Sequence, residues 1–139
     1  MKVTRKILIP LTLLHAYFLP FVSSAQLTGE AKIVDSLFSG IWKGFSLCQQ
    51  KNTACNDEQV VYYISPMVGK YLVPVRASKI VSGREINMGD IEFRFDPDKV
   101  ELVSDSSKVT LWKLKRSENK IQGALYVGDS LYRIVTLSR

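Results

Sequence analysis

The sequence after residue 40 consists of short β-prone runs that turn residues interrupt about every ten positions. No segment there keeps a 3.6-residue apolar period over three helical turns, and parallel pairing would need long, usually helical crossovers. The sequence therefore predicts an antiparallel, up-and-down sheet. The expected strands are 41–47, 60–65, 71–75 continued by 79–81, 91–95, 100–103, 105–107, 109–115, 121–127 and 131–137.

One run shows the strand pattern clearly, because Ile91, Phe93 and Phe95 alternate with Glu92 and Arg94. Such alternation gives a strand one apolar face. A sheet of about eight strands must roll up or pair with a second sheet to bury that face, and closure also removes exposed edges. We therefore predict an all-β fold, a small antiparallel β-barrel, with an antiparallel β-sandwich as the alternative.

The N-terminus has the order of features found in secretory signal peptides. Three basic residues within the first six positions precede an apolar stretch over 7–22, and Ser23 and Ala25 place small residues where a signal peptidase reads them. The apolar stretch is shorter than the about 20 residues of a membrane-spanning helix and contains two prolines. We expect residues 1–25 to be cleaved and the chain to be periplasmic or secreted, with an uncleaved anchor as the alternative.

Loss of this leader changes the charge and the chemistry of the chain. The full sequence has 19 Lys and Arg against 13 Asp and Glu, and the leader removes three of the basic residues, which leaves a net charge of +3. Such mild, scattered charge does not favour nucleic-acid binding. The one histidine, His15, also lies in the leader. The mature chain therefore has no histidine general base, no Ser-His or Cys-His pair and no histidine-ligated zinc.

Two cysteines, Cys48 and Cys55, remain in the mature chain. An even cysteine count in an exported chain favours a disulfide, and the polar, loop-like residues 49–54 allow the two Cα atoms to approach closely enough. The alternatives are a redox pair or a two-thiolate metal site. Since the spacing is not C-x-x-C and no further Cys or His completes a tetrahedral site, we predict the disulfide.

The part of the chain after the leader is long enough for one domain. Residues 26–36 are polar and contain Gly29, which predicts a loose N-terminal arm. A short amphipathic helical turn around Val34 and Phe38 can lead from this arm into the core. Residues 37–139 are expected to form the barrel domain.

The first expected strand opens with Gly40-Ile41-Trp42-Lys43-Gly44. The order of arm, short helical turn, G-x-W and antiparallel meander resembles the calycin group, which comprises lipocalins, fatty-acid-binding proteins and avidin-like barrels. The resemblance implies a lipocalin-like barrel in which Trp42 closes the floor and an Arg from the last strand, here Arg133, lies over it. The chain is shorter than a typical lipocalin and has no middle lipocalin motif. Segments 42–48, 55–58 and 88–90 also resemble small exported bacterial proteins of unassigned function.

Aromatic residues in the expected strands are candidate ligand contacts. The candidate ligand-binding residues are Trp42, Tyr63, Tyr71, Phe93, Phe95, Trp112, Tyr126 and Arg133. Such rings line ligand sites, but they also pair across strands or fill cores, which is the alternative for Trp42 above all. Arg133 shares a strand face with the apolar Leu131 and Val135, so it needs a partner if that face is buried. If the opposite face is buried instead, Arg133 is solvated.

Two kinds of charged segment are candidates for further sites. Lys113 and Lys115 share one face of a late strand, which favours a solvated outer face, with contact to an anionic membrane or polysaccharide as the alternative. The acidic residues in segments 57–58 and 96–98 and Asp105 lack the spacing of an EF-hand. We therefore expect them to belong to turns rather than to a calcium site. No metal site and no cofactor are predicted.

These observations together predict a non-catalytic, exported barrel. It would bind a small apolar or amphipathic ligand in its mouth, against Trp42 and inward tyrosines, with Arg133 as a polar anchor. The alternative is an extracytoplasmic protein-interaction or inhibitor module with a filled core and no ligand cavity. A histidine-free enzyme that works with Asp, Glu, Tyr, Lys or Arg is the third hypothesis. We expect no nucleic-acid partner and no integral membrane span after cleavage.

Overall fold

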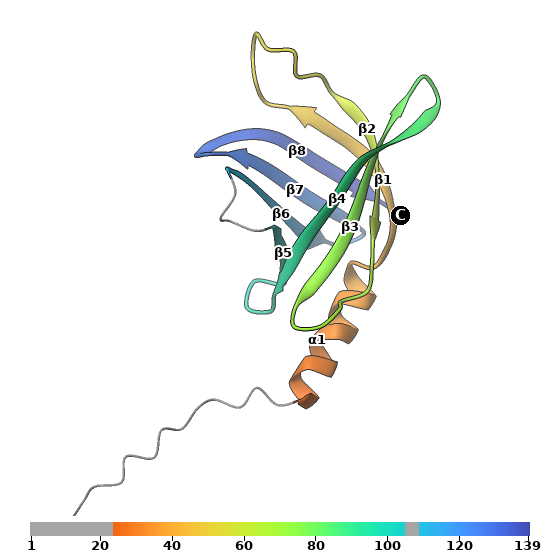
Figure 1. Ribbon diagram of the computed structural model, residues 1–139, viewed down its shortest axis with the longest axis vertical. Coiled ribbons are helices and arrows are strands. Elements are labelled where there is room, and N and C mark those ends of the chain that lie inside the picture. The colour runs from red at the N-terminus through yellow and green to blue at the C-terminus, as the bar shows by residue number, and fades with distance from the viewer. Residues whose placement is uncertain (1–23, 105–108) are drawn as a thin grey trace, which may run out of the picture.

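The computed structural model describes residues 24–104 and 109–139, in which one helix precedes eight strands (Figure 1). Each strand is antiparallel to its neighbours, and β8 pairs with β1 to close a barrel in the order β1 to β8. The predicted all-β, up-and-down barrel is confirmed, and the sandwich alternative is wrong. The elements are α1 (Ser24–Leu37), β1 (Gly40–Cys48), β2 (Glu58–Ile64), β3 (Leu72–Val81), β4 (Arg84–Asp96), β5 (Glu101–Ser104), β6 (Thr110–Ser117), β7 (Lys120–Val127) and β8 (Ser130–Ser138).

The β3–β4 hairpin differs from the expected strand boundaries. The two short runs expected at 71–75 and 79–81 form one strand, β3. Residues 88–90, between two of the expected runs, do not end a strand but lie inside β4, where the β3–β4 register is shifted and Gly89 takes a φ of 124° that favours glycine. The hairpin turns at Ser82 and Gly83, directly after the run expected at 79–81, and both residues have positive φ, as a type I′ turn requires. The run expected at 105–107 lies outside the described residues.

Residues 26–36 belong to helix α1 rather than to a loose arm. Glu30, Val34 and Phe38 follow one another at intervals of four, which places them on one helical face, and all three are buried. The amide groups of Phe38 and Ser39 both donate to the Val34 carbonyl oxygen, where the helix ends. The Phe38 ring then meets the edge of Phe95 with centroids 6.4 Å apart. The helix therefore docks onto the barrel through a narrow buried face.

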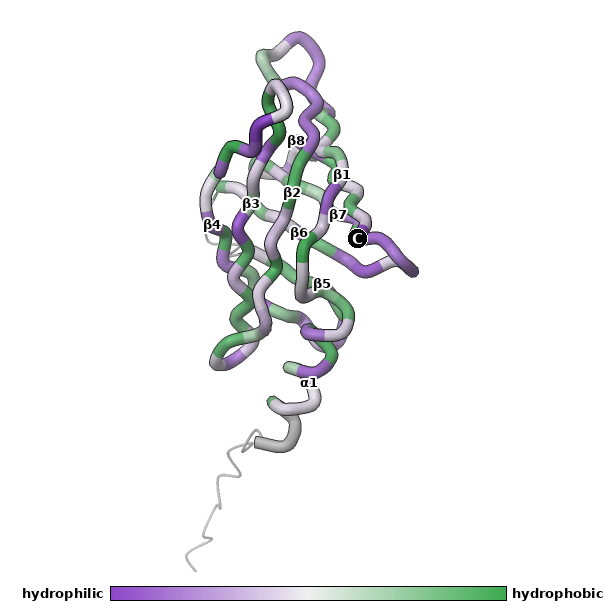
Figure 2. Tube along the Cα trace, turned by 90° about the vertical axis from the view of Figure 1, so that its right-hand side faces the viewer, coloured by the Kyte–Doolittle hydropathy of each residue, from purple (hydrophilic) through white to green (hydrophobic). Residues whose placement is uncertain are grey.

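Apolar side chains from the strands fill the barrel next to α1. Figure 2 shows green hydrophobic stretches within the strands and largely hydrophilic connections at the far end. We call the end beside α1 the helix end. The opposite end, formed by the β1–β2, β3–β4 and β7–β8 connections, we call the mouth. The buried core comprises Val34, Phe38, Trp42, Val60, Tyr62, Ile64, Val73, Val75, Ala77, Phe93, Phe95, Leu102, Leu114, Ile121, Val135 and Leu137.

Barrel closure brings the backbones of β1 and β8 into close contact at Gly44. Gly44 pairs with Leu137, and a Cβ atom built on it would collide with the Thr136 carbonyl oxygen and lie 3.0 Å from the Leu137 Cα. Backbone atoms of a paired strand cannot move aside as a flexible side chain can. The seam between the first and last strands therefore requires glycine at this position.

The substitution Gly44→Ala tests this requirement. We expect it to lower the free energy of unfolding by about 2 kcal/mol or more, because an added methyl group overpacks a rigid contact. Gly29→Ala is the matched control, since Gly29 lies within α1 with no neighbouring atom within 4 Å of an added Cβ. That control should gain up to about 1 kcal/mol from helix propensity. Urea unfolding measures the stability of both variants. An unchanged unfolding midpoint for Gly44→Ala would contradict the requirement for glycine at the β1–β8 contact.

Candidate functional site

Trp42 closes the helix end of the barrel. Its side chain is fully buried, and its indole Nε1 donates to the Phe38 carbonyl oxygen at 2.6 Å. The guanidinium groups of Arg139 and Arg116 lie over the ring, 4.6 and 4.7 Å from its centroid. Arg139 also donates to the Ser39 carbonyl oxygen at 2.7 Å, so it links the end of the chain to the α1–β1 connection. This end is a packed floor.

The expectation that Arg133 lies over Trp42 is wrong, because Arg139 and Arg116 occupy that position. The register explains the error. Arg133 pairs with Cys48 at the far end of β1, whereas Trp42 stands six residues earlier on the same strand. Six residues of a strand span about 20 Å, so the two side chains belong to opposite ends of the barrel.

A pair of aromatic rings crosses the lumen above the floor. The Tyr62 ring on β2 meets Trp112 on β6 edge to face, with centroids 6.4 Å apart. Since β2 and β6 are not neighbouring strands, this contact spans the barrel interior. Burial raises the pKa of Tyr62 far above its usual value, with Arg133 opposing the change and Glu58 adding to it. The phenol therefore stays neutral, and the two rings fill part of the lumen between β2 and β6.

Four polar side chains meet on the mouth side of this ring pair, and we call them the mouth cluster: Ser46, Glu58, Lys79 and Arg133. The two oxygens of Glu58 bind different cations, Lys79 Nζ at 3.0 Å and Arg133 Nη1 at 3.3 Å. Arg133 Nη1 also donates to the Ser46 hydroxyl oxygen at 3.1 Å, and the Arg133 side chain is only 13% exposed. The cluster thus sets two basic groups against one carboxylate in a partly dehydrated place.

The predicted disulfide between Cys48 and Cys55 is confirmed, with the two Cα atoms 5.9 Å apart. Its loop is held against the barrel, because Asp57 Oδ1 accepts from the Cys48 amide at 2.8 Å and Gln50 donates to the Leu131 carbonyl oxygen. Directly after Cys55, the Asn56 carbonyl oxygen accepts from Arg133 Nη2 at 3.1 Å. The segment that follows the disulfide therefore supplies one of the acceptors that orient Arg133.

Apolar side chains continue the mouth cluster across the barrel wall. Leu125 pairs with Arg133 on one side and with Trp112 on the other, so the three residues form one transverse row on β8, β7 and β6. The Trp112 amide donates to Ser104 Oγ at 2.8 Å, which fixes β6 in this row. The mouth thus has a charged half and an apolar half.

The other candidate ligand contacts do not join this site. Phe93 and Phe95 are buried in the core. The Tyr63 hydroxyl donates to Glu85 at 2.9 Å on the barrel exterior, and that hydrogen bond raises the Tyr63 pKa. The Tyr71 hydroxyl donates to Glu30 of α1, which raises the Tyr71 pKa and places the ring at the helix end. Tyr126, opposite Leu131 on the outer face, also lies away from the mouth. Of the eight predicted residues, the structure brings Trp112 and Arg133 together at the mouth.

Sequence reasoning missed Ser46, Glu58 and Lys79. A signal was present, because Glu58 has the same strand parity as Val60 and Tyr62 and therefore faces inward with them. Within the described ranges, no three His, Cys, Asp or Glu side chains are grouped so that they could hold a metal ion.

Comparison of the chain with protein-family models, curated proteins and solved structures gives no match. We therefore infer the function from the chain's own geometry. That geometry consists of a packed floor, a ring pair across the lumen and a mouth with charged and apolar halves.

The double variant Cys48→Ser/Cys55→Ser tests what the disulfide loop contributes. We expect the free energy of unfolding to fall by about 2.5 kcal/mol, because the closed loop has about eight residues, while far-ultraviolet circular dichroism keeps the barrel signature. Adding reductant to the wild-type protein should reproduce the loss, and adding it to the double variant should change nothing. Equal stability of the two proteins would show that the loop is held without the disulfide.

Proposed function

We propose that this protein binds a small anionic amphiphile at the mouth of its barrel, without catalysis. The observation that carries the proposal is the mouth cluster, in which Lys79 and Arg133 share the single carboxylate of Glu58. An acidic head group would bind beside the two cations, and an apolar tail would cover Trp112 and Leu125.

The charge balance of the cluster favours an anion. Within the cluster two basic groups face one carboxylate, and the Arg133 side chain is the most buried of the three, with 13% exposed. Charge-assisted hydrogen bonds are stronger than neutral ones, and a guanidinium matches the planar geometry of a carboxylate. A cationic ligand would find only Glu58, which already binds two partners.

The filled lumen limits the ligand to the mouth. An eight-stranded barrel is at the size limit between a side-chain-filled interior and one small ligand site. Trp42 is fully buried, and the Tyr62 and Trp112 rings meet across the lumen, so we assign Trp42 to the floor and not to the ligand contacts. A ligand with a short tail fits this arrangement better than one that must extend through the barrel.

Export and a calycin relationship belong to the same proposal. The disulfide fits an oxidising compartment outside the cytoplasm, although residues 1–23 of the leader expected over 1–25 lie outside the described part of the chain. The closed eight-stranded barrel with guanidinium groups over a G-x-W tryptophan is consistent with a calycin-like protein. Among the described residues, no helix has both the length and the apolarity to cross a membrane.

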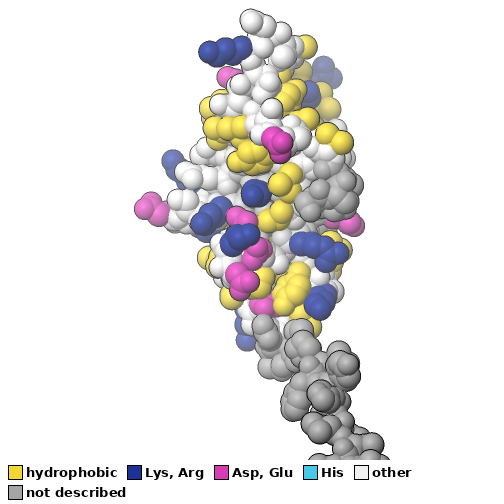
Figure 3. Space-filling model, turned by 90° about the vertical axis from the view of Figure 1, so that its left-hand side faces the viewer, with side chains coloured by type: hydrophobic (Ala, Val, Ile, Leu, Met, Phe, Trp, Pro, Cys, Tyr) yellow, Lys and Arg dark blue, Asp and Glu magenta, His cyan; other side chains and the backbone are white. Residues whose placement is uncertain are grey.

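An interaction module with a filled core is the second candidate, and two observations favour it. The core next to α1 is fully packed. Hydrophobic side chains also reach the surface, and Figure 3 shows several of them on one face with Lys and Arg side chains close beside them. The two candidates differ in whether a small amphiphile binds at all.

Calorimetric titration with three ten-carbon amphiphiles tests the proposal: decanoate, decanol and decyltrimethylammonium, each below its micelle concentration. Decanoate should bind about tenfold more tightly than decanol, because one charge-assisted hydrogen bond contributes about 1.5 kcal/mol, and the cationic amphiphile should bind most weakly. Equal affinity for all three, or no binding, would contradict the proposal.

Matched arginine and lysine variants locate the site. Lys79→Gln and Arg133→Gln should each weaken decanoate binding about tenfold while decanol binding changes little. Arg76→Gln is the control, because Arg76 is an exposed cation on the same strand as Lys79 but lies over the outward Tyr63 ring. A loss as large in Arg76→Gln would place the amphiphile outside the mouth.

A further inference from the structure

The outer face of four consecutive strands, β6, β7, β8 and β1, differs in charge from the rest of the barrel. These strands contain no Asp or Glu, and their outward side chains include Lys43, Lys113, Lys115 and Lys120. Acidic residues border these strands in two turns, Glu118 between β6 and β7 and Asp129 between β7 and β8, and on β5 at Glu101, opposite Lys115. We call the outward face of these four strands the acid-free wall.

Large apolar side chains stand exposed on the same wall. Phe45 is 59% exposed, and Leu47 and Ile134 are 43% and 38% exposed. Strand pairing joins Leu47 to Ile134 directly and places Phe45 opposite Thr136, so these side chains are neighbours. An aromatic ring and two aliphatic side chains in one exposed group suggest a contact surface rather than scattered surface residues.

The registers arrange the wall in transverse rows. One row contains Lys113, Ala124, Ile134 and Leu47. The next row contains Lys115, Gln122, Thr136 and Phe45. Each row thus passes from a lysine on β6, over smaller residues, to a large apolar side chain on β1. A third row at the helix end adds Lys120 and Lys43. Lysines therefore border the apolar centre on two sides.

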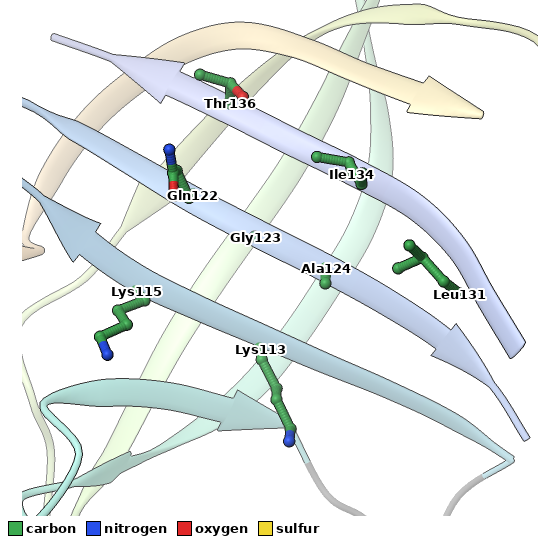
Figure 4. A pocket seen from close by; sticks show the side chains of 8 residues that line it. All are labelled: Lys113, Lys115, Gln122, Gly123, Ala124, Leu131, Ile134 and Thr136. Carbon is green, nitrogen blue, oxygen red and sulfur yellow. The ribbon is translucent and has the colours of Figure 1, made fainter. Parts of the chain in front are cut away.

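The smaller residues in the middle of the rows leave an open hollow of about 420 Å³. Figure 4 shows Lys113 and Lys115 along one side of it, on β6, and Ile134 and Thr136 along the other, on β8. Gln122 and Ala124 form its floor between them. The hollow offers apolar surface within reach of two cationic groups.

We propose that the acid-free wall docks the protein onto a lipid surface that carries anionic head groups. The lysines bind the head groups, and Phe45, Leu47 and Ile134 enter the boundary between head groups and acyl chains. Basic residues around exposed aromatic and aliphatic side chains are the composition that anionic membranes attract. This inference is independent of the mouth cluster, whose side chains point into the barrel.

The composition of the wall fits a lipid surface better than a protein partner. Lysine is depleted at protein–protein interfaces, whereas this wall carries four. A second copy of the chain would also bring lysines against lysines if it used the same wall, since no acidic side chain is available there. An anionic lipid surface satisfies both the charge and the exposed apolar group.

Vesicle co-sedimentation tests the inference with phosphatidylcholine vesicles and with vesicles that also contain phosphatidylglycerol. The wild-type protein should bind the phosphatidylglycerol vesicles and release them as salt rises, because screening weakens exposed charges. Lys113→Gln/Lys115→Gln should lower the partition coefficient about 25-fold, since each lysine near an anionic surface contributes about fivefold. Phe45→Ser should lower it about tenfold.

Matched controls keep the test specific. Lys51→Gln/Lys70→Gln removes two exposed lysines from connections outside the wall, and Met88→Ser removes an exposed apolar side chain from β4. These controls should bind vesicles like the wild type, and thermal unfolding should confirm that every variant is folded. The inference is overturned if the wild type does not bind phosphatidylglycerol vesicles, or if the controls lose as much binding as the wall variants. Binding of poly-glutamate through Lys113 and Lys115 without vesicle binding would also overturn it, in favour of an acidic polymer.

Discussion

The close approach of β1 and β8 at Gly44 is the constraint on which the rest of the structure depends. It converts eight strands into a closed barrel, since the Thr136 carbonyl oxygen leaves no room for a side chain there. The same seam places Arg139 beside Trp42 at one end and Arg133 beside Cys48 at the other. The register of this one strand pair therefore determines which arginine lies at each end of the barrel.

Arginine side chains have different partners at the two ends of β1. At the helix end, Arg139 and Arg116 lie over the Trp42 ring, where they close a packed floor. At the mouth, Arg133 binds the Glu58 carboxylate, the Ser46 hydroxyl and the Asn56 carbonyl. An arginine that lies over a ring contributes to packing. An arginine that shares one carboxylate with a lysine can also bind an anionic ligand.

Strand alternation and turn residues were sufficient to predict the barrel, because each strand needed only a local pattern. The disulfide was likewise predictable from two cysteines and a polar loop. The register in which neighbouring strands pair was not predictable from local patterns. That register decides which arginine lies over Trp42 and whether Tyr63 and Tyr126 face inward. A helical turn around Val34 was expected, but the earlier turns of α1 were missed, because the buried positions are Glu30, Val34 and, just after the helix, Phe38, one of them charged. Glu58 and Lys79 were missed because their meeting depends on the pairing of β2 with β3.

The two tryptophans offer a direct test, because Trp42 is fully buried whereas Trp112 is only partly buried. Trp42 belongs to the floor, with its indole bonded to Phe38, and Trp112 belongs to the mouth in the row of Arg133. The decisive measurement is the pair of indole N–H signals in a ¹H–¹⁵N correlation spectrum during titration with decanoate. The account predicts that the Trp112 signal shifts progressively while the Trp42 signal stays in place. A shift of the Trp42 signal, or no shift of either signal, would contradict a binding site at the mouth.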